Sequence, residues 1–230
     1  SGGTDKIRGL LSLSSRFQDS FYKNGSNTYR QYDVRANMDM NPTKYILISF
    51  DLNNRQDIAN YAIDDAGTIF SKIITSSPTK RAYWPDGTLG EAIGTIGNAN
   101  SPVAVSTPLG GYNEIDNYVI NSTLKANIKI PWVEGLSVTS TGTIDRGNAF
   151  GRRWTIPVTY YEWDGNSTTN PAFKPQVEGD KRRTLNENTT KNNNWLVNLL
   201  INYEKQFGDH LVKVLGGYEA YERASNYFSI

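Results

Sequence analysis

Seven stretches of this chain place apolar or small residues at every second position and polar residues between them. The apolar faces hold 37 positions, and none of them is Asp, Glu, Lys or Arg. At the 20% charged content of the chain, about seven charges would fall there by chance. Successive side chains of a strand point to opposite faces, so the pattern predicts an all-β chain whose strands each have one apolar face. The predicted strands cover about 6–19, 28–40, 45–56, 117–130, 136–146, 192–204 and 210–222.

The connections between these strands alternate in length. Three are short, with the sequences "NPTK", "PWVEG" and "KQFGD". Two of the others, over 57–116 and 147–191, are long loops. In an antiparallel meander this order places the tight turns at one edge of the sheet and the long loops at the other. Outer-membrane barrels have short periplasmic turns and long extracellular loops, so the chain is predicted to be a section of a large antiparallel transmembrane β-barrel.

A soluble β-sandwich is the alternative, for example a secreted carbohydrate-binding module whose Trp and Tyr residues form a sugar platform. Ser15, Ser122, Ser140, Gly142 and Gly216 lie on the apolar faces. They would leave space unfilled in a core packed to crystal-like density, but they cost little against fluid lipid. The small residues and the sorted connections favour the barrel.

The number of strands predicts that these residues are part of a larger wall. Single-chain membrane barrels have an even number of strands from eight upward, and an open edge in hydrocarbon leaves backbone groups unpaired. All 230 residues are therefore expected to belong to one barrel domain that other strands complete. The start "SGGTDKIRG" has neither an initiator Met nor an apolar signal region, which also predicts a piece of a longer chain.

Composition argues against several other functions. Cysteine is absent and His210 is the single histidine, which excludes disulfide scaffolds and thiol chemistry and leaves little for histidine-based catalysis. The net charge of +1 gives no reason to expect nucleic acid as a partner. Because no catalytic or ligand spacing occurs, the chain is expected to be neither an enzyme nor a holder of a metal or cofactor.

Aromatic residues in the long loops are the candidate contacts for a substrate or a partner. Flat aromatic faces stack on sugar rings while their polar atoms stay in water, and packing within the loops is the competing role. The candidates are Tyr83, Trp84, Trp154, Tyr160, Tyr161 and Trp163.

A short helix is expected in the first long loop. Asp64 or Asp65 would cap it, and it would end before Pro78. Its apolar stripe would either stiffen the loop or contact a lid partner, and comprises Ile69, Phe70, Ile73 and Ile74.

The polar faces of the strands carry charges of both signs, which are expected to line a wet lumen and pair with one another. They include Arg8, Arg16, Arg35, Asp33, Asp51, Lys125 and Lys129.

Several longer motifs resemble the middle barrel section of SusC/RagA-type TonB-dependent outer-membrane transporters of Bacteroidetes. The resemblance runs through the whole chain and is loosest over 147–191. The motifs that carry it are "SGGTDKIRGLLSLSSRFQDSFYKNGS", "YRQYDVRANMDMNPTKYILISFDLNNRQD", "YWPDGT", "NSPVAV", "IPWVEGLSVTSTGTID" and "NYEKQFGDHLVKVLGGYEAYE".

The resemblance implies nutrient import across the bacterial outer membrane. Members of this family have a large plugged barrel, usually of about 22 strands. TonB, acting across the periplasm, drives transport through this barrel. They pair with a SusD-like surface lipoprotein and take up oligosaccharides or, in some members, peptides. The plug and the TonB box match nothing in this chain, so the resemblance assigns no functional residue.

Overall fold

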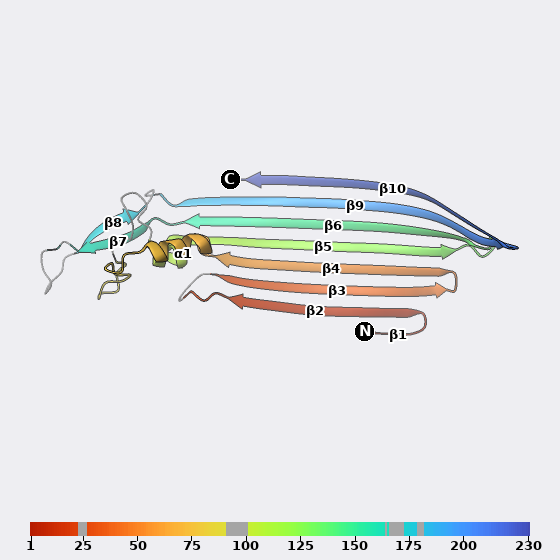
Figure 1. Ribbon diagram of the computed structural model, residues 1–230, viewed down its shortest axis with the longest axis horizontal. Coiled ribbons are helices and arrows are strands. Elements are labelled where there is room, and N and C mark those ends of the chain that lie inside the picture. The colour runs from red at the N-terminus through yellow and green to blue at the C-terminus, as the bar shows by residue number, and fades with distance from the viewer. Residues whose placement is uncertain (23–26, 91–100, 164, 166–172, 179–181) are drawn as a thin grey trace.

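The computed structural model describes residues 1–230 apart from 23–26, 91–100, 164, 166–172 and 179–181. Eight strands form one antiparallel sheet, in the order β1-β2-β3-β4-β5-β6-β9-β10 (Figure 1). The chain is all-β and has the open sheet of a barrel section, as the alternation predicts. The strands of the sheet are β1 (Gly2–Gly3), β2 (Ile7–Asp19), β3 (Thr28–Thr43), β4 (Ile46–Tyr61), β5 (Gly111–Lys129), β6 (Leu136–Thr155), β9 (Thr184–Phe207) and β10 (His210–Ser229).

The remaining elements gather at one end of the sheet, which we call the long-loop end (Figure 1). They are the helices α1 (Ala66–Thr75) and α2 (Pro102–Ser106), the 3-10 turn η1 (Pro108–Gly110), and a separate hairpin of β7 (Val158–Trp163) with β8 (Phe173–Glu178). None of the helices in the described chain has the length and apolar content needed to cross a membrane.

The strands extend further toward the long-loop end than the alternation indicates. β6 continues to Thr155, β9 begins at Thr184 and β5 begins at Gly111, so the loops expected over 57–116 and 147–191 are shorter than the sequence pattern suggested. The second loop also contains the β7–β8 hairpin. The physical reason is that polar residues occupy positions on both faces of these extensions, which interrupts the alternation while the backbone ladder continues.

The register of the strands separates the sheet into two faces. Strand partners in an antiparallel pair point to the same side, so one row of side chains can be followed across the sheet. Such a row runs Leu11, Ala36, Leu52, Ser122, Ile144, Trp195 and Glu222. The next row, on the opposite side, runs Leu10, Asn37, Asp51, Thr123, Thr143, Leu196 and Tyr221. We call the side of the first row the outer face and the side of the second row the inner face.

Apolar and small residues form a band on the outer face. In four strands the band covers nine residues and five outward positions, about the length that a tilted strand needs to cross a bilayer. Polar outer-face residues follow above it, toward the long-loop end. The nine-residue stretches are 32–40 in β3, 136–144 in β6, 195–203 in β9 and 212–220 in β10.

This apolar band crosses the strands at a slant. Met40, its last residue in β3, lies in the same row as Tyr218 of β10. In β10, however, the band continues for six more residues, to Val212. The displacement is about 20 Å along the strands over five inter-strand steps of about 4.8 Å, which corresponds to a tilt of about 40°. Membrane barrels have strand tilts of about 35–45°.

The buried core lies at the long-loop end and not against the sheet's apolar face. Ala62, Ile63, Ile69 and Val105 are buried together, and Tyr22 packs against them. By contrast, Leu13 on the outer face of β2 is 71% exposed. A β-sandwich buries such residues between two sheets, so the described residues do not have the sandwich architecture.

Gly135, in the tight turn between β5 and β6, is a position where an added side chain should be harmful. Its φ is +86°, and a Cβ atom would collide with the backbone carbonyl of Glu204. Gly208, in the turn before β10, has a φ of +58° and nothing within 4 Å of the added atom.

We therefore expect Gly135→Ala to lower the free energy of unfolding more than Gly208→Ala. The second substitution carries only the left-handed backbone strain of about 1–2 kcal/mol, while the first adds about 1–3 kcal/mol of steric overlap. Urea denaturation of both variants measures the difference, and equal losses would contradict the turn geometry.

Candidate functional site

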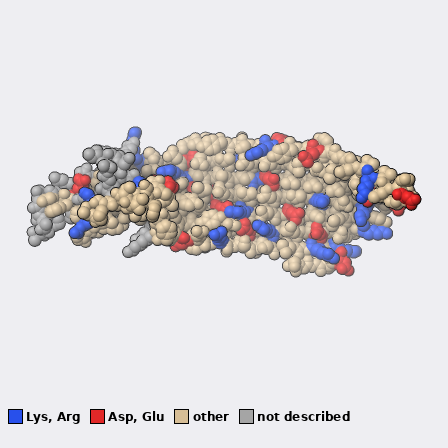
Figure 2. Space-filling model, viewed as in Figure 1, with Lys and Arg blue, Asp and Glu red and all other residues tan. Residues whose placement is uncertain are grey.

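The inner face is the polar side of the sheet, and it contains a hollow at the long-loop end. Figure 2 shows charges of both signs interspersed over the sheet on the face turned to the viewer. The hollow, which we call the inner hollow, has a volume of about 700 Å³. It lies between the ends of β2, β3 and β4 and the start of α1. Its lining includes Arg16, Gln18, Asp19, Tyr22, Tyr29, Gln31, Arg55 and Tyr61.

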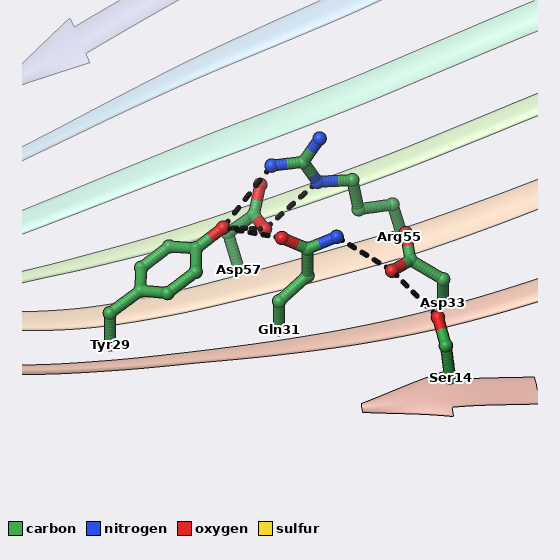
Figure 3. A network of polar contacts seen from close by, with 6 residues as sticks. All are labelled: Ser14, Tyr29, Gln31, Asp33, Arg55 and Asp57. Carbon is green, nitrogen blue, oxygen red and sulfur yellow. Dashed lines mark hydrogen bonds and ion pairs between the residues drawn. The ribbon is translucent and has the colours of Figure 1, made fainter. Parts of the chain in front are cut away.

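A hydrogen-bonded network forms the floor of the inner hollow (Figure 3). The Tyr29 hydroxyl oxygen lies 2.7 Å from Asp57 Oδ1 and 2.8 Å from Gln31 Oε1. Arg55 donates from Nε to Asp57 Oδ1 at 2.9 Å and from Nη2 to the Tyr29 oxygen at 3.2 Å. These four residues come from two neighbouring strands, so the ladder between β3 and β4 holds the floor in place.

Asp33 extends this network toward β2. Its Oδ2 accepts from Gln31 Nε2 at 2.6 Å and from the Ser14 hydroxyl at 3.1 Å. Three strands thus contribute to one connected set of polar groups. Such connected networks order their members more strongly than isolated hydrogen bonds do.

The inner hollow contains one guanidinium that no carboxylate neutralises within the described residues. Arg55 is paired with Asp57, whereas Arg16 makes one hydrogen bond, from Nη2 to Gln18 Oε1 at 3.4 Å. Aromatic rings line the same space, and the rings of Phe21 and Tyr22 have centroids 4.5 Å apart. This set of groups suits a polar solute that carries a carboxylate or several hydroxyls.

A second hollow of about 480 Å³ adjoins the first at the start of α1. The two share Asn27, Tyr61 and Ala66. Asn27 Oδ1 accepts from the backbone N–H of Ala62 at 2.5 Å, which ties the described end of the β2–β3 connection to the start of the long loop. Arg153 of β6 lines the far side.

Asp65 is the residue that caps α1, and Asp64 has a different role. Asp65 Oδ1 accepts from the backbone N–H of Thr68 at 3.0 Å and its Oδ2 from the Thr68 hydroxyl at 2.6 Å. The bond from the Thr68 hydroxyl, with the bond from its backbone N–H, lowers the pKa of the Asp65 carboxyl. Asp64 forms an ion pair with Lys72.

The apolar stripe expected on α1 is buried only in part. Ile69 is fully buried, whereas Phe70, Ile73 and Ile74 are 62%, 47% and 66% exposed. The helix is a single layer over the small core, and Ile69 is its one residue that is buried with Ile63 and Val105 among the described residues.

Two of the six candidate aromatic residues meet in the structure. The segment around Trp84 forms a tight turn, closed by a bridge between Tyr83 and Leu89. The Trp84 indole N–H donates to the carbonyl of Tyr161 at 2.7 Å, and the Tyr161 N–H donates to the carbonyl of Leu89 at 3.0 Å. This turn is thereby bound to β7, which gives Trp84 a role in loop packing, while Tyr83 stays 48% exposed.

Three further candidates lie in β6 and β7. Tyr160 and Trp163 are in β7, where they pair with Gln176 and Phe173 of β8. Trp154 is a strand residue of β6 and not a loop residue, and it lies in the row of Tyr112 and Leu185.

The sequence reasoning identified Arg16 and Asp33 as inner-face residues and missed the rest of the inner hollow. Tyr29 and Arg55 lie one residue inside the ends of the predicted strands 28–40 and 45–56, where the alternation fades. Their signal was the continued polar face opposite Tyr32 and Leu52. Within the described residues, His, Asp and Glu side chains nowhere form a group of three suited to a metal ion.

Comparison with known proteins bears on the fold. No protein-family model matches the chain, and no curated protein matches it. Solved structures do match. One of them, described as the structure of the RagAB peptide transporter, is 17% identical, with a TM-score of 0.65 over 100% of this chain. The sheet therefore shares its fold with a part of that protein. The chain spans 24% of the length of that protein.

The capping carboxylate of Asp65 predicts a pH dependence of the first long loop. Its pKa is lower in the folded helix than in an unfolded chain, so the stabilisation is present above the ordinary value of about 3.9 and is lost as the pH falls through the lowered value. Amide hydrogen exchange should therefore show weaker protection of α1 at acidic pH. Asp65→Asn, which keeps an acceptor oxygen, should remove the pH dependence. Asp65→Ala should weaken protection at all pH values, and unchanged protection in that variant would contradict the cap.

Proposed function

We propose that this chain is a wall section of an outer-membrane importer of the SusC/RagA type. The observation that carries the proposal is the slanted apolar band on the outer face. Its length along each strand and its tilt of about 40° fit a sheet that crosses a bilayer obliquely. The polar inner face would then line the lumen, with the long-loop end outside the cell and the tight turns in the periplasm.

The importer would move its substrate by binding and by rearrangement of a plug, without bond chemistry. Its proposed partners are TonB, acting through a part of the protein outside this chain, and a SusD-like surface lipoprotein at the long-loop end. The motif resemblance and the fold likeness to the RagAB peptide transporter support this assignment. Its substrate class is oligosaccharides or peptides.

The inner hollow is the proposed substrate contact on this section of the wall. It lies at the upper edge of the apolar band, on the lumen side, where a solute that enters from outside would first meet the wall. Arg16 offers a cation, and the floor around Tyr29 and Arg55 offers ordered polar groups. The rings of Phe21 and Tyr22 offer aromatic faces.

Two adjacent residues of β9 test the membrane position. Leu199 is on the outer face in the middle of the apolar band, and Asn198 is on the inner face, where its Nδ2 donates to Glu219 at 3.1 Å. In the full-length protein, we expect Leu199→Arg to cost about 2–4 kcal/mol because it places a charge in hydrocarbon. Asn198→Arg should be tolerated, since the new cation faces water and Glu219.

The measurement is the amount of each variant in the outer-membrane fraction, with heat-dependent gel mobility as the sign of a folded barrel. The proposal is supported if the Leu199→Arg variant is missing from the outer-membrane fraction while the Asn198→Arg variant accumulates there. If both variants accumulate equally, the outer face does not meet lipid. If the wild-type protein is found in a soluble fraction, the transporter assignment fails.

Arg16→Gln distinguishes the two substrate classes. A peptide carboxylate that binds Arg16 would lose a charged hydrogen bond of about 1.5–3 kcal/mol, so peptide affinity should fall about tenfold or more. A neutral oligosaccharide should be little affected. Lys125→Gln removes an inner-face cation outside the inner hollow and serves as the control. Calorimetric titration measures the ligand affinities of both variants. If Arg16→Gln leaves the affinity for every ligand unchanged, Arg16 does not contact the substrate.

A further inference from the structure

Two cations lie together on the outer face just above the apolar band. Arg146 of β6 follows Ile144, the last band residue of that strand, by two positions. Lys191 of β9 is one diagonal step away, because Arg146 pairs with Asn193. Diagonal neighbours on one face are about 7–8 Å apart, so both side chains can reach a single anionic group.

No acidic residue neutralises this cation pair within the described part of the chain. Its direct cross-strand neighbours on the outer face are Ile120 and three amides, namely Asn148, Asn193 and Asn226. The nearest carboxylates have other partners. Glu222 accepts from the indole N–H of Trp195 at 2.9 Å, and Asp116 accepts from Gln56 at 3.1 Å.

Other outer-face cations of the described sheet do have a partner. Arg152 forms an ion pair with Glu187 at 2.6 Å, and Arg30 lies over the ring of Phe17 at 5.7 Å. Arg146 and Lys191 are thus distinguished by carrying two exposed charges side by side, among groups that donate hydrogen bonds.

The positions of the two cations along their strands give their heights above the apolar band. Arg146 is about 7 Å along the strand beyond Ile144, and Lys191 about 13 Å beyond Trp195. Because the strands are tilted by about 40°, these lengths correspond to heights above the apolar band of about 5 Å for Arg146 and about 10 Å for Lys191, measured along the membrane normal. The polar head-group layer is about 5–7 Å thick on each side of a bilayer, and a lysine side chain reaches down toward it.

Aromatic residues flank the cation pair at this boundary. Trp195 is 41% exposed below it and Tyr118 is 37% exposed beside it. Tyr and Trp favour this level of a membrane because one end of each ring is apolar and the other end is polar.

We propose that Arg146 and Lys191 form a binding site for the phosphate group of a membrane lipid, in the leaflet at the long-loop end. The guanidinium would bind two phosphate oxygens with its planar fork, and the ammonium would add a point charge. The neighbouring amides donate further hydrogen bonds. The inference rests on the proposed membrane position and adds to it a specific lipid contact.

A fluorophore at the small outer-face residue Ser122 reports which lipid lies under the site. Ser122 pairs with Ile144 and so lies within the apolar band beside Arg146. The full-length protein with Ser122→Cys, in a background without other cysteines, is labelled with bimane and placed in phosphatidylcholine vesicles. The vesicles contain either phosphatidic acid or phosphatidylcholine with a doxyl quencher at carbon 5 of one acyl chain.

In the wild-type background, we expect quencher-labelled phosphatidic acid to quench the bimane at a lower mole fraction than quencher-labelled phosphatidylcholine does. The two mole fractions should differ by a factor of up to about thirty for two cations. Arg146→Gln with Lys191→Gln should abolish this preference. Lys125→Gln with Lys129→Gln removes the same charge from the inner face and should leave the preference intact.

Each other outcome overturns a different claim. Equal quenching by both lipids in the wild-type protein, or a preference that survives in the Arg146/Lys191 variant, overturns the lipid site while leaving the membrane position in place. If neither lipid quenches the bimane, Ser122 does not lie in the bilayer, and both the membrane position and the lipid site are then wrong. If inorganic phosphate abolishes the preference where sodium chloride of equal ionic strength does not, the site binds soluble phosphate and the assignment to a lipid is wrong.

Discussion

The in-register antiparallel ladder is the constraint on which the rest of this structure depends. Side chains alternate between faces with a period of two, so a slip of one residue would exchange the outer and inner faces. In β6, for example, such a slip would bring Asp145 into the position of Ile144. The charge-free apolar band therefore penalises every slip by an odd number of residues. The tight turns between consecutive strands fix the register further.

The ladder also determines where each function would lie. Following one strand of the sheet from the tight turns, the outer face is first apolar and then polar. The inner face carries polar residues along its whole length, with scattered apolar ones such as Leu10 and Leu196. The apolar band therefore lies nearer the tight turns, while the cation pair of Arg146 and Lys191 and the inner hollow lie toward the long-loop end, on opposite faces of one sheet. A barrel wall combines these properties because its two faces meet different solvents, and the solvent on the outer side changes with height.

The candidate site shows why sequence reasoning found only part of it. Arg16 and Asp33 were recognised because they oppose clear apolar positions. Tyr29, Arg55 and Asp57 lie where both faces of the strands are polar, so no alternation marks them. Trp84 was recognised as a loop aromatic, but its bond to the carbonyl of Tyr161 joins residues 77 positions apart, and no local pattern encodes that distance.

The sequence by itself determined the all-β class, the two faces, and the order of short and long connections. Those properties are local, because they follow from side-chain alternation and from turn residues such as Gly135 and Gly208. Only the tertiary structure decided the slant of the apolar band, the extension of β5, β6 and β9 beyond it, and the residues that meet in the inner hollow. These depend on the relative register of strands far apart in the chain, which the hydrogen-bonded ladder sets and a single strand's pattern does not contain.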